Sequence, residues 1–392
     1  MTLDSQQPAA NRASLATVAR EWTRIGVTGF GGPPAHIALL HELVVRRTGW
    51  LDARAFEDAN AACNLLPGPA STQLAIFCAY QVAGAPGAIV GGLGFVVPAV
   101  AVILPLSALF LAHTPPLWAR GAGAGAGAAV AAVAVHAARG LLAPSFNRVR
   151  GNRDRQARWL AYLAAGTASA ALFGAYLVLA LLACGLLELL LQRRPPPRLG
   201  RHSATLGSIA PASISAGGIG ALAWTAFKVG ALSFGGGFVI IPLMQSDAVH
   251  TFHWMTNSQF LNAVALGQIT PGPVVATVAA VGYAAHGVAG GLLAATVAFA
   301  PSFSFILLAG PRFQRLRQNT SQRAFLDGAG PAAIGAIFGA AITLAVALHE
   351  EWQFAILGAA AIALLAFRRS VVQTLLGAAA LGTIAALTGA PL

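Results

Sequence analysis

The chain has 392 residues, of which 57% are hydrophobic and only 9% are charged, and its net charge is +12 at neutral pH. A soluble domain carries about a quarter charged residues, so this composition excludes an ordinary soluble protein. It predicts an all-α polytopic membrane protein. The basic residues lie in short clusters between apolar runs, as in cytoplasmic loops, which indicates contact with membrane lipid and no nucleic-acid partner.

Apolar segments follow one another in two sets of six. The first 20 residues are polar and predict no cleavable signal peptide, so we expect the first apolar segment to direct insertion into the inner membrane of a bacterium. The first set covers 22–44, 57–82, 87–112, 121–141, 159–173 and 175–191. The second set covers 218–244, 260–285, 287–309, 328–348, 352–367 and 370–388. A basic, proline-rich linker at 193–212 separates them, and we expect one repeat at 1–192 and another at 213–392.

Two helix-breaking motifs occur once in each half, with the same offset of 204 residues. Phe30-Gly31-Gly32 recurs as Phe234-Gly235-Gly236, and Pro67-Gly68-Pro69 recurs as Pro271-Gly272-Pro273. Arg24 and Lys228 keep that offset. Duplicated halves with broken apolar helices are typical of secondary transporters, whose site lies where the repeats meet.

The charges of the loops predict that the two repeats are inverted. Loop 139–158 carries six arginines, whereas its repeat near 349–351 reads His-Glu-Glu. Loop 310–323 carries four arginines, whereas its repeat at 112–120 carries one. Matching loops therefore belong on opposite sides of the membrane. Inversion requires an odd number of spans per half, so we expect about five in each, with the segment that contains Pro-Gly-Pro re-entrant.

The glycine and proline motifs suggest an anion site. Adjacent glycines interrupt a helix and expose backbone N–H groups that favour an anion, although glycines also serve close helix packing. Neutral side chains near Pro-Gly-Pro could bind the oxygens of an oxyanion or could satisfy the broken backbone. Arg24 and Lys228, the only lysine, could neutralise a dianion or could extend to the membrane edge. The predicted site comprises Arg24, Phe30, Gly31, Gly32, Asn64, Pro67, Gly68, Pro69, Lys228, Phe234, Gly235, Gly236, Gln268, Thr270, Pro271, Gly272 and Pro273.

Other chemistry is poorly supported by the sequence. The histidines and cysteines lack the spacing of a metal site, and neither a P-loop nor a nucleophile–base pattern is present. We therefore expect no enzyme activity, no metal and no cofactor. A coupling proton is possible, and its candidate carriers are His36, His41, Glu42, Asp58, Asp247 and Asp327.

The chain resembles the chromate ion transporter family in its long, two-domain form. The resemblance rests on residues 24–33 and 228–237, on Gly49-Trp50 and on both Pro-Gly-Pro motifs. It implies export of chromate from the cytoplasm and chromate resistance, with sulfate as an isosteric substrate. Import of sulfate or another oxyanion, an anion channel and a homodimer stay open. The halves differ, since Phe-Gly-Gly-Gly in the second replaces Phe-Gly-Gly-Pro-Pro, so they need not contact the substrate equally.

Overall fold

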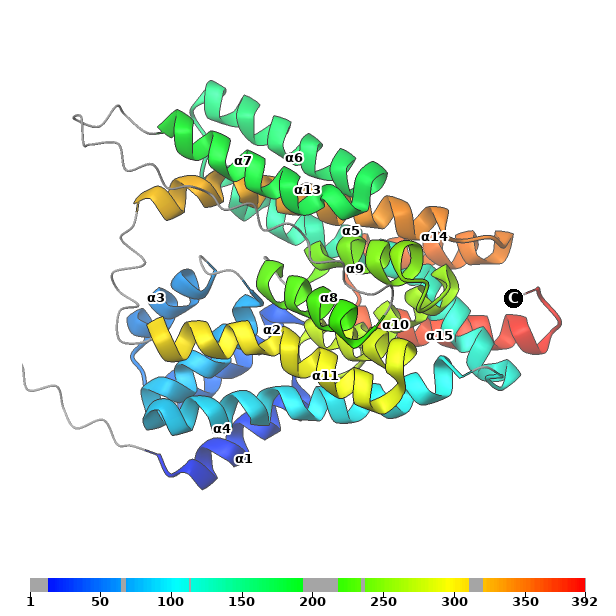
Figure 1. Cartoon of the computed structure of the whole chain (residues 1–392), viewed down its shortest axis with the longest axis horizontal. Coiled ribbons are helices and arrows are strands. Elements are labelled where there is room, and N and C mark those ends of the chain that lie inside the picture. The colour runs from blue at the N-terminus through cyan, green and yellow to red at the C-terminus, as the bar shows by residue number, and fades with distance from the viewer. Residues whose placement is uncertain are drawn as a thin grey trace, which may run out of the picture.

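The computed structural model describes residues 13–64, 68–112, 114–192, 218–233, 237–309 and 320–391, and every regular element within them is a helix (Figure 1). The first half contains α1 (Leu15–Thr28), α2 (Pro33–His41), the π-helix η1 (Glu42–Arg47), α3 (Ala53–Cys63), α4 (Ala70–Phe110), α5 (Leu117–Asn147), α6 (Arg153–Phe173), η2 (Gly174–Tyr176) and α7 (Leu177–Gln192). The second half contains α8 (Ile219–Leu232), η3 (Phe238–Ile240), α9 (Ile241–Gln245), the π-helix η4 (Ser246–Thr251), α10 (Asn257–Ile269), η5 (Val274–Ala276), α11 (Thr277–Ala309), α13 (Thr320–Val346), α14 (Glu351–Leu365) and α15 (Val371–Leu387).

Equivalent elements precede and follow the duplicated motifs. Helices α1 and α8 begin and end 204 residues apart, and so do the π-helices η1 and η4. Each half also begins its next helix with a side-chain cap. Asp52 accepts from the N–H of Ala55 before α3, and Thr256 forms a capping box with Gln259 before α10. A polar oxygen at this position satisfies N–H groups that the first turn leaves unpaired.

Helices α4 and α11 each fold back on themselves as a helical hairpin. The turns lie at Gly84 (φ +66°) and Gly287 (φ +63°), where the positive φ favours glycine. The arms touch closely, since a Cβ atom at Gly87 would lie 2.5 Å from the carbonyl oxygen of Ala79. A short arm thus follows each Pro-Gly-Pro motif and a long arm follows the turn.

Two apolar segments of the first half are interrupted, whereas the predicted span count assumed one. Segment 57–82 is divided by Pro-Gly-Pro into α3 and the short arm of α4. Segment 22–44 is divided into α1 and α2 at Gly31 and Gly32, whose φ values of +103° and +72° are incompatible with a continuous helix.

The helices confirm an α-helical polytopic membrane protein. Four are long and apolar enough to cross a bilayer, namely Ala70–Phe110, Leu117–Asn147, Val274–Leu308 and Thr320–Val346. Four further apolar helices have 10–17 residues, namely α7, α8, α14 and α15. The expectation of about five spans in each half stays a prediction.

The two halves exchange helices. The long helix α5 of the first half packs against α14 and α15, while its counterpart α13 packs against α6 and α7 (Figure 1). Helices α4 and α11 pack against each other as antiparallel partners. A Cβ atom at Gly92 would meet the ring of Phe303, whereas one at Gly291 would meet Leu104. These reciprocal contacts bring the broken segments of both halves together.

Candidate functional site

Each Pro-Gly-Pro motif packs against the other half of the protein. A Cβ atom at Gly68 would lie 3.3 Å from the carbonyl oxygen of Gly230 on α8 and 3.4 Å from Oγ of Ser302 on α11. At the equivalent place, a Cβ atom at Gly272 would lie 3.6 Å from the carbonyl oxygen of Gly26 on α1 and 2.9 Å from Cβ of Ala99 on α4. Glycine is required at both positions because φ is +117° at Gly68 and +93° at Gly272.

The first contact, which we call the polar crossing, comprises Gly68, Thr72, Gly230, Ser233 and Ser302. Thr72 lies in the first turn after Gly68, and Ser233 directly follows α8. The hydroxyl groups of Thr72, Ser233 and Ser302 have no hydrogen-bond partner among the described residues, and all three residues are completely buried. Buried polar groups are almost always hydrogen-bonded, so the three unpartnered hydroxyls are candidate donors to a ligand with acceptor oxygens.

The second contact, which we call the apolar crossing, comprises Gly26, Gly29, Phe95, Ala99 and Gly272. The N–H of Gly272 donates to the carbonyl oxygen of Gly29 at 3.0 Å, which ties the two halves together directly. The positions that carry Ser233, Ser302 and Thr72 in the polar crossing correspond here to Gly29, Ala99 and Ala276. The two crossings are therefore related in backbone but not in polarity.

Buried His36 packs against the apolar crossing. Its Nε2 lies 2.9 Å from the carbonyl oxygen of Gly29, its Nδ1 lies 3.4 Å from Oγ of Ser71, and its ring meets Phe95 edge-on. Because a carbonyl oxygen only accepts, Nε2 carries the proton and Nδ1 accepts from Ser71. This histidine, a candidate proton carrier in the sequence, is thus held in a fixed tautomer next to the polar crossing.

The two predicted cations each pair with a carboxylate of their own half. Nζ of Lys228 lies 2.5 Å from Oδ2 of Asp247, whose side chain is only 7% exposed and also accepts from Thr225 at 2.8 Å. Arg24 is 55% exposed, and its Nε lies 3.3 Å from Glu21. In this conformation, neither charge is left uncompensated for a substrate.

The remaining predicted residues are placed unequally around the crossings. Phe30 is 46% exposed, and Pro33-Pro34 at the start of α2 remove two of the N–H groups that a helix start would offer an anion. Thr270 bonds locally to the carbonyl oxygen of Gly267, while Gln268 is buried with its Nε2 unpartnered among the described residues. Pro69 precedes α4, and Pro271 and Pro273 flank Gly272. Pro67, Phe234, Gly235 and Gly236 lie outside the described residues.

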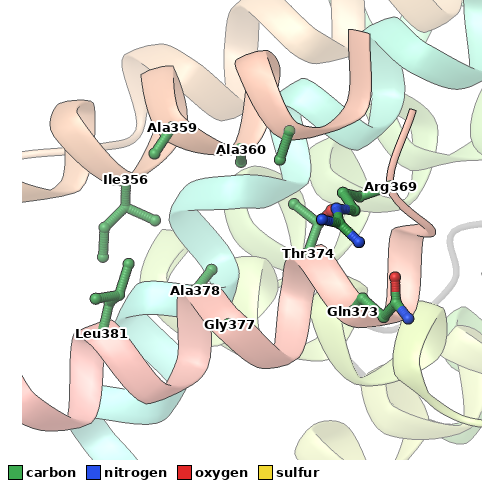
Figure 2. A pocket seen from close by; sticks show the side chains of 10 residues that line it. Ile356, Ala359, Ala360, Arg369, Gln373, Thr374, Gly377, Ala378 and Leu381 are labelled. Atoms are coloured by element: carbon green, nitrogen blue, oxygen red, sulfur yellow. The ribbon is translucent and has the colours of Figure 1, made fainter. Parts of the chain in front are cut away.

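A cavity of about 780 Å³ lies between α3, α5 and α13. Its polar lining consists of Asn64, which also bonds to Asn60, and of Asp58, Ser145, Arg148, Arg323 and Asp327. A second pocket of about 370 Å³ lies between α14 and α15, is lined largely by alanine and leucine or isoleucine side chains, and contains no residue of the predicted site (Figure 2). The cavity beside α3 is therefore the one next to a Pro-Gly-Pro motif.

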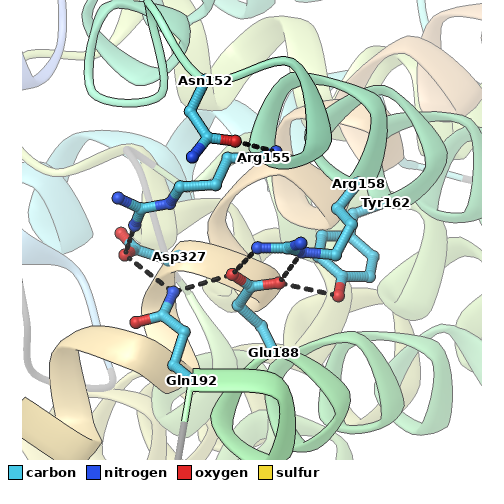
Figure 3. Close-up of polar contacts among 7 residues, drawn as sticks. All are labelled: Asn152, Arg155, Arg158, Tyr162, Glu188, Gln192 and Asp327. Carbon is cyan, nitrogen blue, oxygen red and sulfur yellow. Dashed lines mark hydrogen bonds and ion pairs between the residues drawn. The ribbon is translucent and has the colours of Figure 1, made fainter.

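A polar network stabilises one wall of the molecule (Figure 3). Glu188 on α7 accepts from Arg158, Tyr162 and Gln192, at 2.7–3.1 Å. Arg155 pairs with Asp327 of α13 at 3.0 Å. These contacts join α6, α7 and α13, and they use the charge of Asp327 for a structural bond.

Comparison with known proteins identifies the family. Residues 16–189 and 220–383 match the sequence model described as Chromate transporter. The chain belongs to the chromate transporter family. The Chromate transport protein of Cupriavidus metallidurans is 31% identical over 340 residues, which are 85% of this chain and 83% of that protein.

Two further members of the chromate transporter family show the same extent of similarity. The Probable chromate transport protein of Synechococcus elongatus is 28% identical over 356 residues, 88% of each chain. The Chromate transport protein of Pseudomonas aeruginosa is 29% identical over 346 residues, 82% of this chain and 79% of that protein. No solved structure matches the chain. The resemblance seen in the paired motifs is thus confirmed.

Ser233 and Ser302 were not among the predicted site residues. Both lie in apolar segments, Ser233 directly before the glycine motif and Ser302 directly after Pro301 and two residues before Ser304. A search for hydroxyl side chains next to helix breakers would have found both, because such side chains commonly satisfy broken backbone or bind a ligand.

Proposed function

We propose that this protein is a secondary transporter that exports a tetrahedral divalent oxyanion from the cytoplasm across a bacterial inner membrane, with chromate as the first substrate and sulfate as the second. Such export confers chromate resistance. The observation that carries the proposal is the set of three unpartnered hydroxyls at the polar crossing. An oxyanion with four acceptor oxygens suits hydroxyl donors on α4, on α11 and directly after α8, and chromate is the substrate named for the curated relatives.

The two halves act as inverted repeats in this proposal. Support comes from the antiparallel packing of the long arms of α4 and α11, which are equivalent elements. Further support comes from loops 139–158 and 310–323, whose arginines belong to the same, cytoplasmic side. Substrate then binds where the inverted halves cross, and rocking of one set of helices against the other exposes it to alternate sides.

The charge of a dianion is balanced by dipoles rather than by a free cation. In the described parts of the site, Lys228 is already paired with Asp247, so hydroxyl groups and backbone N–H groups are the donors left for the substrate. The start of the short arm of α4, directly after Pro69, presents the positive end of a helix dipole to the polar crossing. Hydrogen bonds to a charged group are each about twice as strong as neutral ones.

The test is uptake of radiolabelled chromate into everted membrane vesicles, with Ser302→Ala compared to wild type. Loss of one hydrogen bond to a charged ligand costs about 1.5–3 kcal/mol, so we expect the apparent KM to rise about tenfold or more. Ser107→Ala is the matched control, because Ser107 is equally buried in the long arm of α4 but donates to the carbonyl oxygen of Ile103. An unchanged KM for Ser302→Ala would remove the polar crossing from the substrate path.

The same vesicles separate the rival functions. Competition by unlabelled sulfate tests the second substrate, and collapse of the proton gradient tests coupling to protons. Saturable counterflow is expected of a transporter and contradicts a channel. In whole cells an exporter lowers the chromium content, whereas an importer raises it.

A further inference from the structure

We propose that the cavity between α3, α5 and α13 is the entrance from the arginine-rich face, which is the face that carries the arginines of loop 139–158. Arg148 and Arg323 capture the divalent oxyanion there before it reaches the polar crossing. This inference rests on the proposed function and adds an entry site to it. It assigns substrate capture to two arginines that belong to no sequence motif.

Both arginines line the cavity without a carboxylate partner among the described residues. Arg148 caps the C-terminal end of α5, and Arg323 lies in the first turn of α13. Their neighbours Arg155 and Arg158 behave differently, because each is paired with an acidic side chain (Figure 3). Uncompensated charge at the mouth of a concave, low-dielectric surface raises the local concentration of an oppositely charged ligand.

The acidic residues of the wall leave it positive. Asp327 lines the cavity but is neutralised by Arg155 at 3.0 Å. The other carboxylate of the lining is Asp58, so its one negative charge stands beside the two positive charges of Arg148 and Arg323. A cavity that selects anions over cations requires such an excess, and a dianion gains twice as much from it as a monovalent anion.

The cavity is lined by one residue near the broken segment of each half. Asn64, at the end of α3, lines it four residues before Gly68 of the polar crossing. Val239 of η3 lines it from the second half, two residues after Gly237. An anion held by the arginines therefore lies beside the segments that carry the proposed binding site.

The equivalent place at the opposite end is closed by α10. A Cβ atom at Gly123 of α5 would lie 2.8 Å from the amide of Asn262, and one at Gly127 would lie 3.0 Å from Cβ of Leu261. At Gly330, the counterpart of Gly127 in α13, no atom of the described residues lies within 4 Å of the added Cβ. The described structure is therefore open beside α3 and closed beside α10, which is the asymmetry that an alternating-access transporter requires.

The experiment measures sulfate and chromate uptake into everted vesicles, which present the arginine-rich face to the medium. Arg148→Gln, Arg323→Gln and the double variant are compared with Arg120→Gln. Arg120 is the matched control because it occupies the position equivalent to Arg323 at the other end of the molecule and is also exposed. Arg148→Lys with Arg323→Lys keeps the charge and serves as the rescue variant.

At low ionic strength we expect the double variant to raise the KM for the dianion about tenfold with little change in maximal rate, since steering by charge changes encounter by about 10- to 1000-fold. The difference shrinks at high salt because screening shortens the range of the charges. Arg120→Gln and the lysine variant keep the wild-type KM. Equal KM values for the double variant and wild type overturn the entrance while wild-type transport persists, whereas loss of chromate and sulfate transport in wild type itself counts against the proposed function.

Discussion

Replacement of Lys228 by methionine is expected to reduce the stability of the protein far more than its affinity for substrate. Nζ of Lys228 and Oδ2 of Asp247 are 2.5 Å apart, and the two side chains are only 18% and 7% exposed. Removal of Lys228 leaves a buried carboxylate whose remaining hydrogen-bond donor among the described residues is Thr225. Breaking a buried pair in this way costs about 3–5 kcal/mol, or a factor of roughly 100 to several thousand in the unfolding equilibrium.

The double variant Lys228→Met with Asp247→Leu distinguishes a structural pair from a substrate ligand. Replacement of both partners by apolar side chains is often neutral or stabilising, so we expect it to recover most of the stability and the chromate uptake. The free energy of unfolding is measured in mixed micelles with increasing denaturing detergent, and uptake is measured in vesicles at equal protein levels.

Arg24→Met is the control, because Glu21 keeps ion pairs with Arg20 and Arg47 when Arg24 is absent. The Arg24 side chain is 55% exposed, and Glu21 keeps two other cationic partners, so the lost pair should cost at most about 1 kcal/mol and this variant should unfold almost like wild type. The reasoning is refuted if Lys228→Met keeps the wild-type unfolding free energy but loses uptake, and if the double variant stays inactive. Lys228 would then contact the substrate directly.

Three further predictions concern packing and the polar network. Gly230→Ala should lower the thermal unfolding temperature markedly, because its Cβ would lie 1.9 Å from the carbonyl oxygen of Ala298, whereas Gly330→Ala should be neutral or slightly stabilising. Gly330→Leu should slow maximal transport but leave sulfate-dependent thermal stabilisation intact, if α3 must approach this position during exchange; unchanged turnover would contradict that motion. Glu188→Gln should destabilise by about 1.5–3 kcal/mol through its lost charge-assisted hydrogen bonds, with no change in the KM for chromate, and a raised KM would place the network in the site.

The repeated motifs allowed much of the backbone to be predicted. The constant offset of 204 residues already implied that α1 and α8, and the segments around both Pro-Gly-Pro motifs, have the same form. Glycine and proline act locally, so their effect on helices can be inferred without tertiary contacts. The segment 22–44 shows a limit of hydropathy, because this single apolar run contains two helices, α1 and α2, which are separated at Gly31 and Gly32.

The site was less predictable because its groups meet across the two halves. Lys228 was recognised as unusual, but its partner lies 19 residues further on, on a π-helix whose register no simple periodicity indicates. Ser302 approaches Gly68 only because α11 packs against the first half. Pairings of this kind depend on how helices are arranged in three dimensions, and the spacing of residues within one helix carries no information about them.

Under the proposed function, the divergence between the two crossings gives a duplicated protein one binding place for a dianion. Two identical polar crossings would both contain unpartnered buried hydroxyls, and each crossing would lose stability when no ligand is bound. The apolar crossing carries Gly29 and Ala99 in place of Ser233 and Ser302. Its backbone is bonded to buried His36, and the equivalent position in the second half is Ile240. In that proposal the duplicated backbone supplies two reciprocal breaks for alternate opening, and the side chains confine the hydroxyl donors to the polar crossing. The proposal therefore assigns backbone symmetry to movement and side-chain asymmetry to recognition of the substrate.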